Sequence, residues 1–156
     1  MPTSPKSSDA EQKALLYIAG CSDVEKLHQI ARNADRAGAM TVRQAARLRI
    51  YALSPAQQPG TLEHEVWQSI YALEDVLSDE AGATRRLSRT RQKIARDGEH
   101  KTVCDLVLGK PSEGFAMLVD RDMTDYTFEA VALRFAERFD PSVLEGAKRR
   151  LADRAK

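Results

Sequence analysis

The residues best suited to do chemistry are cations concentrated in one short segment, "TRRLSRTRQKIAR", residues 84–96. Six of these residues are Arg or Lys, whereas the whole chain has a formal net charge of only +1. Arginine forms paired hydrogen bonds to phosphate, and each neutralised phosphate of a nucleic acid releases condensed counterions. The segment therefore indicates a polyanion as one possible partner.

The spacing of these cations predicts an amphipathic helix over 84–97. On a helical wheel, five of the cations fall within an arc of roughly 100°, and Leu87 and Ile94 lie on the opposite side. We expect the five, with Lys101 extending the patch, to contact nucleic acid, and duplex DNA in particular. The five cations are Arg85, Arg86, Arg89, Lys93 and Arg96.

An internal role for the basic helix is the main alternative. Residues 61–83 carry six Asp or Glu and no Lys or Arg. Consecutive helices joined by a short turn pack antiparallel, so the basic helix could form ion pairs with an acidic helix over 61–80. The acids are scattered around their helix and cannot pair with the whole arc. The sequence leaves open whether the cations face DNA, an acidic protein, the acidic helix or solvent.

A second hypothesis for function is a helical adaptor that binds another protein. Trp67 and Tyr71 fall outside the main apolar stripe of the helix expected after residue 61, so this helix is apolar on more than one side. Either this aromatic flank or the basic face could bind a protein partner.

Catalytic and metal-binding patterns are absent from the sequence. His28, His64 and His100 are expected at the surface, and no serine-nucleophile motif, Walker loop or dinucleotide glycine fingerprint occurs. Cys21 and Cys104 make no disulfide framework, which favours reduced thiols and a cytoplasmic protein. We therefore expect no enzyme activity, cofactor, metal or small-molecule substrate. No apolar run is long enough for a membrane span.

Helix-start signals and a 3.6-residue apolar period predict an all-α protein with seven to eight short-to-medium helices. Capping-box spacing marks three early starts, at Ser8, Ser22 and Thr41. Two prolines and a glycine interrupt the periodicity after the third helix. We expect a disordered tail over 1–8, a three-helix unit over 9–53, a linker over 54–60 and a helical domain over 61–154.

Overall fold

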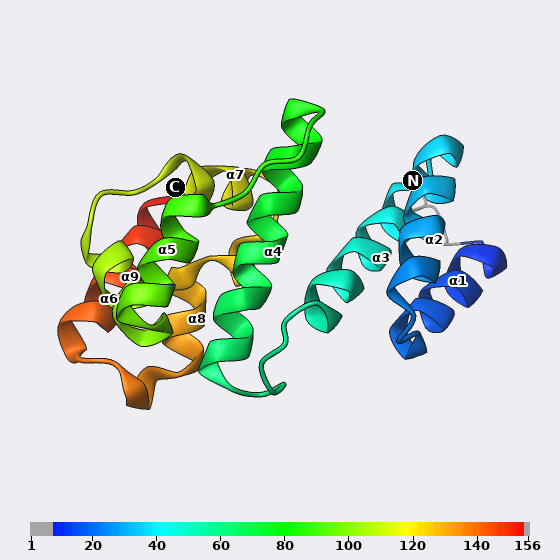
Figure 1. Ribbon diagram of the computed structural model, residues 1–156. Helices are drawn as coiled ribbons and strands as arrows, with labels where there is room; N and C mark the ends of the chain where they lie inside the picture. The colour runs from blue at the N-terminus through cyan, green and yellow to red at the C-terminus, as the bar shows by residue number, and fades with distance from the viewer. Residues whose placement is uncertain (1–7, 155–156) are drawn as a thin grey trace. The chain divides into compact units, whose positions relative to one another are not determined.

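The computed structural model describes residues 8–154, so the tail expected over 1–8 lies, apart from Ser8, outside the described residues. Within that range all regular elements are helical, which confirms the predicted all-α class. The described residues form nine α-helices and two short 3-10 helices, so the predicted seven to eight is too low (Figure 1). The α-helices are α1 (Asp9–Gly20), α2 (Val24–Ala37), α3 (Met40–Leu53), α4 (Leu62–Ala81), α5 (Ser88–Asp97), α6 (Glu99–Leu108), α7 (Glu113–Asp120), α8 (Phe128–Arg134) and α9 (Pro141–Arg154), and the 3-10 helices are η1 (Thr124–Tyr126) and η2 (Ala136–Arg138).

The last helices before α9 are short. Helices α7 and α8 have 8 and 7 residues, about two turns each. Helix α8 ends at Arg134, and the chain then continues as the 3-10 turn η2.

The helix starts follow the capping signals only in part. The Ser8 hydroxyl accepts a hydrogen bond from a backbone N–H of the first turn of α1 at 3.1 Å, which confirms this start. Helix α2 is capped by Asp23 rather than Ser22, and α3 begins at Met40, before Thr41, without a side-chain cap. When tertiary packing sets where a helix begins, the N-cap can be an adjacent residue that caps equally well, such as Asp23, or a residue with no capping side chain, such as Ala39.

The chain divides into two compact units, Met1–Ser54 and Pro55–Lys156. In the first unit α3 packs against both α1 and α2. Leu27 of α2 and Ala46 of α3 are fully buried there, and the small alanine side chain lets the two helix axes approach closely.

Helix α4 is the central element of the second unit. It contacts α6, α7, α8 and η1, and its Leu62, Val66 and Ile70 are fully buried. Helix α9 packs on α6 and α8, where it buries Val143 and Ala147. This packing fixes the surface on which the basic segment lies.

Helices α5 and α6 are joined by the single residue Gly98. Its φ of 86° lies in the region that favours glycine. The Gly98 N–H donates to Ile94 O at 2.7 Å, and its carbonyl accepts from the Thr102 N–H and hydroxyl at 3.2 and 2.7 Å. The two helices therefore meet at a sharp turn, and Gly98 is hydrogen-bonded to both of them.

Candidate nucleic-acid interface

The basic segment starts as extended chain that is hydrogen-bonded to α4. The Arg85 N–H donates to the Ser78 hydroxyl at 2.8 Å, and the Leu87 N–H donates to a Glu74 carboxylate oxygen at 2.8 Å. Helix α5 consequently begins at Ser88, so the helix expected over 84–97 is shorter than predicted. Tertiary hydrogen bonds to α4 replace the helical turn that periodicity alone favours.

Arg91 connects α5 to the acidic helix α4. Its guanidinium donates to both oxygens of Glu74, from Nε at 2.7 Å and from Nη2 at 2.6 Å. The hydrogen bonds to Glu74 raise the pKa of Arg91 above its ordinary value. The Glu74 side chain is buried. The internal ion pairing that the sequence left open is therefore real, and it is made by a residue outside the predicted cationic arc.

The signal for Arg91 was present in the sequence. Leu87, Arg91 and Ile94 are spaced four and three residues apart, which places Arg91 on the same inward side as the two apolar residues. Ile94 is buried and Leu87 packs against the core of the second unit. An arginine on this side requires an acidic partner, and Glu74 provides it.

Trp67 and Tyr71, the aromatic flank expected to bind a protein, lie beneath the same arginine. The Arg91 guanidinium carbon lies 5.2 Å from the centre of the Trp67 ring and 5.6 Å from that of Tyr71. The indole N–H of Trp67 also donates to Glu99 at 3.1 Å. Both aromatic side chains are half-buried, so much of this flank is engaged within the chain.

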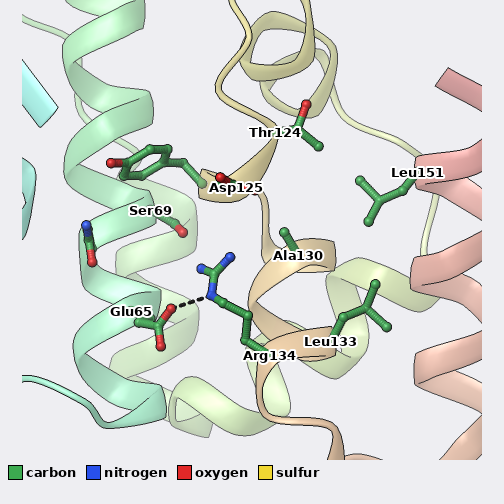
Figure 2. A pocket seen from close by; sticks show the side chains of 10 residues that line it. Glu65, Ser69, Thr124, Asp125, Ala130, Leu133, Arg134 and Leu151 are labelled. Atoms are coloured by element: carbon green, nitrogen blue, oxygen red, sulfur yellow. Dashed lines mark hydrogen bonds and ion pairs between the residues drawn. The ribbon is translucent and has the colours of Figure 1, made fainter. Parts of the chain in front are cut away.

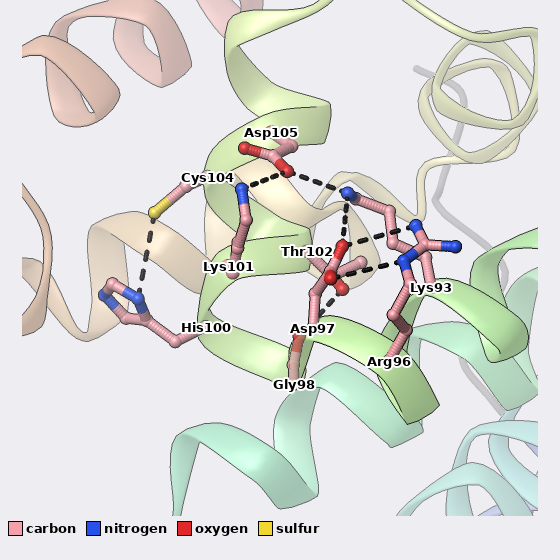
Figure 3. Close-up of polar contacts among 9 residues, drawn as sticks. All are labelled: Lys93, Arg96, Asp97, Gly98, His100, Lys101, Thr102, Cys104 and Asp105. Atoms are coloured by element: carbon pink, nitrogen blue, oxygen red, sulfur yellow. Dashed lines mark hydrogen bonds and ion pairs between the residues drawn. The ribbon is translucent and has the colours of Figure 1, made fainter.

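Three further predicted site residues belong to one ion-pair network on α5 and α6 (Figure 3). Lys93 Nζ lies 3.0 Å from Asp97 and 2.7 Å from Asp105. Arg96 pairs with Asp97 at 3.3 Å, and Lys101 pairs with Asp105 at 2.9 Å. The network therefore holds three cations and two carboxylates, which neutralise most of its charge.

The pKa shifts in this network follow from its hydrogen bonds. The pKa of Asp105 is lowered by Lys93 and then by Lys101, and the pKa of Asp97 is lowered by Lys93 and then by Arg96. Hydrogen bonds to Asp105 and Asp97 raise the pKa of Lys93. Each shift stabilises the charged form, so the network is ionised at neutral pH.

Arg85, Arg86 and Arg89 form the remainder of the predicted site, and we refer to them as the arginine patch. All three are exposed. Among residues 8–154, no carboxylate lies within ion-pair distance of any of them. Arg89 lies in the first turn of α5, which contains no acidic residue, and the other two lie just before it.

The position of the arginine patch is electrostatically unfavourable for the helix itself. The N-terminus of an α-helix carries a partial positive charge, so cations there are disfavoured and an anion is favoured. The N-cap residue Leu87 also offers no side-chain acceptor. The arrangement suits an external anion that would neutralise the patch.

A histidine and a cysteine lie close together on α6, where His100 and Cys104 are one turn apart (Figure 3). The His100 ring stacks on Phe139 with centroids 4.6 Å apart, and His100 Nε2 lies 2.6 Å from the Arg138 carbonyl. A carbonyl only accepts, so Nε2 carries the proton and Nδ1 faces the Cys104 thiol at 3.9 Å. Burial, followed by Asp105 and Asp140, raises the pKa of Cys104, so the thiol stays protonated at neutral pH.

A pocket of about 580 Å³ lies between α4, η1 and α8 (Figure 2). Glu65 accepts a hydrogen bond from Arg134 Nε at 2.5 Å across it, which neutralises both charges. Tyr126 lines the same pocket, and its pKa is raised by burial and then by Asp125. Glu65 and Arg134 are thus paired with each other, while the Asp125 side chain also lines the pocket.

Within the described part of the chain, no cluster of three or more His, Cys, Asp or Glu is arranged to hold a metal ion. No helix in residues 8–154 has both the length and the apolar character required to cross a bilayer. Comparison of the chain with models of protein families, with curated proteins and with solved structures finds no match. The interpretation of the interface therefore depends on the geometry described above.

Proposed function

We propose that this protein binds the phosphate backbone of a nucleic acid, duplex DNA in the first place, through the arginine patch. One contrast carries the proposal. Four cations of the basic segment and α6 each lie within ion-pair distance of a carboxylate, whereas the three of the arginine patch have none among residues 8–154. The four paired cations are Arg91, Lys93, Arg96 and Lys101.

The two-point ion pair between Glu74 and Arg91 supports phosphate binding by the arginine patch. It holds the segment that carries Arg85 and Arg86 against α4 and fixes where α5 begins. Three guanidinium groups on a held backbone lose less conformational freedom on binding than three on a mobile loop. Arg96 and Lys101 are exposed and extend the contact, while Lys93 contributes less because two carboxylates neutralise it.

Docking of a protein through Trp67 and Tyr71 has less support, because Arg91 and Glu99 already contact these rings. An acidic protein could contact the arginine patch instead. Salt dependence separates the two partners, since binding to a nucleic acid weakens with salt according to the number of phosphates contacted.

The test is the affinity for a labelled duplex at about 50 mM salt, measured by fluorescence anisotropy. The double variant Arg86→Gln and Arg89→Gln should bind at least about tenfold more weakly, and its log K against log salt slope should be shallower by about two. Lys148→Gln with Arg149→Gln is the matched control, because both residues are exposed on α9 and the charge change is the same. It should change the affinity by less than about twofold.

Two results would reject the proposal. One is the absence of binding to duplex and single-stranded DNA below roughly 100 μM at about 50 mM salt. The other is an equal loss of affinity in both double variants, which would show attraction by overall charge rather than by the arginine patch.

A further inference from the structure

A second pocket in the C-terminal unit is lined mainly by apolar side chains, and none of the three arginines of the patch lines it. Its volume of about 410 Å³ falls within the range of roughly 300–1,000 Å³ that is usual for small-molecule sites. Side chains from α4, α6, α7 and α8 line most of it. Its apolar lining includes Ile70, Leu73, Leu77, Leu106, Phe115 and Phe128.

Gly114 of α7 lines this cavity and lies against α4. A Cβ placed on Gly114 would lie 2.5 Å from Leu73 Cδ2, so α7 and α4 are in direct contact there. The cavity lies beside this contact, so α4 and α7 cannot move closer together to fill it. A ligand that fits there would remove the apolar lining from contact with water and would stabilise the unit.

The charged groups of the lining cancel one another. The Glu129 carboxylate accepts a hydrogen bond from Arg150 Nη1 at 2.7 Å, and both side chains are almost fully buried. Arg150 also donates to the carbonyls of Leu106 and Gly109. Its guanidinium is therefore already committed to groups of this chain.

The other two charged residues of the lining, within the described part of the chain, are Lys110 and Glu113. Both are exposed, they have opposite sign, and they lie where the cavity reaches the surface. The cavity thus has no net charge to offer to an ion. Below the mouth, Glu129 and Arg150 are paired with each other, so the described lining offers a buried ligand charge no unpaired counter-ion there. Desolvating a ligand charge at that depth is costly, which favours a neutral ligand.

We propose that this cavity binds one neutral, predominantly apolar small molecule. The ligand would lie against Leu73, Leu106 and Phe115, with Lys110 and Glu113 at the mouth. Its affinity would come from burial of apolar surface in a preformed cavity and would change little with salt.

The experiment uses the full chain and two probes that share one ring system. N-phenylnaphthylamine is neutral, and anilinonaphthalene sulfonate adds a sulfonate to it. We expect the neutral probe to bind one to one with a Kd below about 50 μM, to raise the melting temperature, and to bind at least about tenfold more tightly than the sulfonate. Amide NMR shifts on titration should concentrate at the residues of the cavity.

Two leucines of α6 give matched variants. Leu106 lines the cavity and is 36% exposed, whereas Leu108 on the same helix is 57% exposed and does not line it. Leu106→Trp should fill part of the space and weaken the neutral probe at least about tenfold, while Leu108→Trp should leave its affinity within about twofold.

Three outcomes would overturn the proposal. They are no saturable binding of the neutral probe up to about 100 μM, tighter binding of the sulfonate at the cavity residues, and equal losses in the two tryptophan variants. If Leu106→Trp does not fold, Leu73→Phe, which also enlarges a side chain of the lining, replaces it with the same expected loss.

Discussion

Glu74 on α4 and Arg91 on α5 form a two-point contact, with both carboxylate oxygens accepting from one guanidinium at 2.6 and 2.7 Å. The same carboxylate accepts the Leu87 N–H at 2.8 Å. One acidic side chain therefore binds the half-buried Arg91 and a backbone donor at the start of α5. Because α5 has no side-chain cap of its own, Glu74 performs that role from another helix.

Removal of Glu74 should destabilise the C-terminal unit. Glu74→Ala leaves the Arg91 charge and the Leu87 N–H without their acceptor, and we expect a loss of about 2–4 kcal/mol in the free energy of unfolding. Urea denaturation followed by the fluorescence of Trp67, the single tryptophan of the chain, measures this loss. Arg89→Met serves as the control and should cost less than about 0.5 kcal/mol, because Arg89 is exposed. Equal losses in the two variants would contradict the role of Glu74.

The ion-pair network of Lys93 should act within a definite pH window. The lowered pKa values of Asp97 and Asp105 give stability that is present above the unfolded value of about 3.9 and is lost as pH falls through the folded values. The raised pKa of Lys93 gives stability that is present below about 10.4 and is lost as pH rises through its folded value. The network should therefore contribute between about pH 4 and pH 10.

Asp105→Asn tests this window. The difference in unfolding free energy between wild type and variant should shrink as pH is lowered from about 6 to about 2, because Asp105 becomes protonated in the wild type. It should also shrink at about 1 M salt, because ion pairs near solvent are screened. A difference that stays constant down to about pH 2 would show that Asp105 acts through packing or uncharged hydrogen bonds instead.

The Cys104 thiol should react slowly at neutral pH. Its pKa is raised by burial and by the negative charges of Asp105 and Asp140, and only the thiolate is nucleophilic. In a Cys21→Ser background, the rate with a disulfide reagent should continue to rise above about pH 8.5. Asp140→Asn should shift this rise to lower pH. A rate that is already at its plateau near pH 7 would mean that His100 instead holds the thiolate.

The N-terminal unit should tolerate little extra volume between α2 and α3. Ala46 is fully buried in its core, so Ala46→Leu should cost about 1–3 kcal/mol by forcing the two helices apart. Ala37→Leu near the end of α2 is the control, because Ala37 is exposed and should lose less than about 0.5 kcal/mol. Thermal unfolding of the two variants distinguishes them, and a loss of equal size in both would contradict close packing at Ala46.

The fold class was predictable because its signals are local. Ser8, Thr61, Ser112 and Thr127 each cap the helix that follows, as their position before an apolar period indicates. The start of α5 was not predictable in this way. It depends on hydrogen bonds from Arg85 and Leu87 to α4, and nothing near residue 84 in the sequence shows that these bonds form.

The candidate site was predictable where its contacts are local in sequence. Lys93 with Asp97 and Lys101 with Asp105 have the i,i+4 spacing of helical ion pairs, and so do His100 and Cys104. Those spacings indicate pairing for Lys93 and Lys101, two of the six predicted cations, whereas the pairing of Arg96 with the adjacent Asp97 has no such spacing. The Lys93–Asp105 pair was not predictable from spacing, because it forms only when the chain turns sharply at Gly98.

The corner at Gly98 also determines how α5 and α6 open to solvent. Amide hydrogens at helix ends commonly exchange fastest, but the N–H and the carbonyl of Gly98 are each hydrogen-bonded in one of the two helices. Gly98 therefore closes the last turn of α5 with its N–H and the first turn of α6 with its carbonyl. We expect the two helices to exchange as one unit, so that an anion bound at Arg89 would slow deuterium uptake at Thr102, on the far side of the corner.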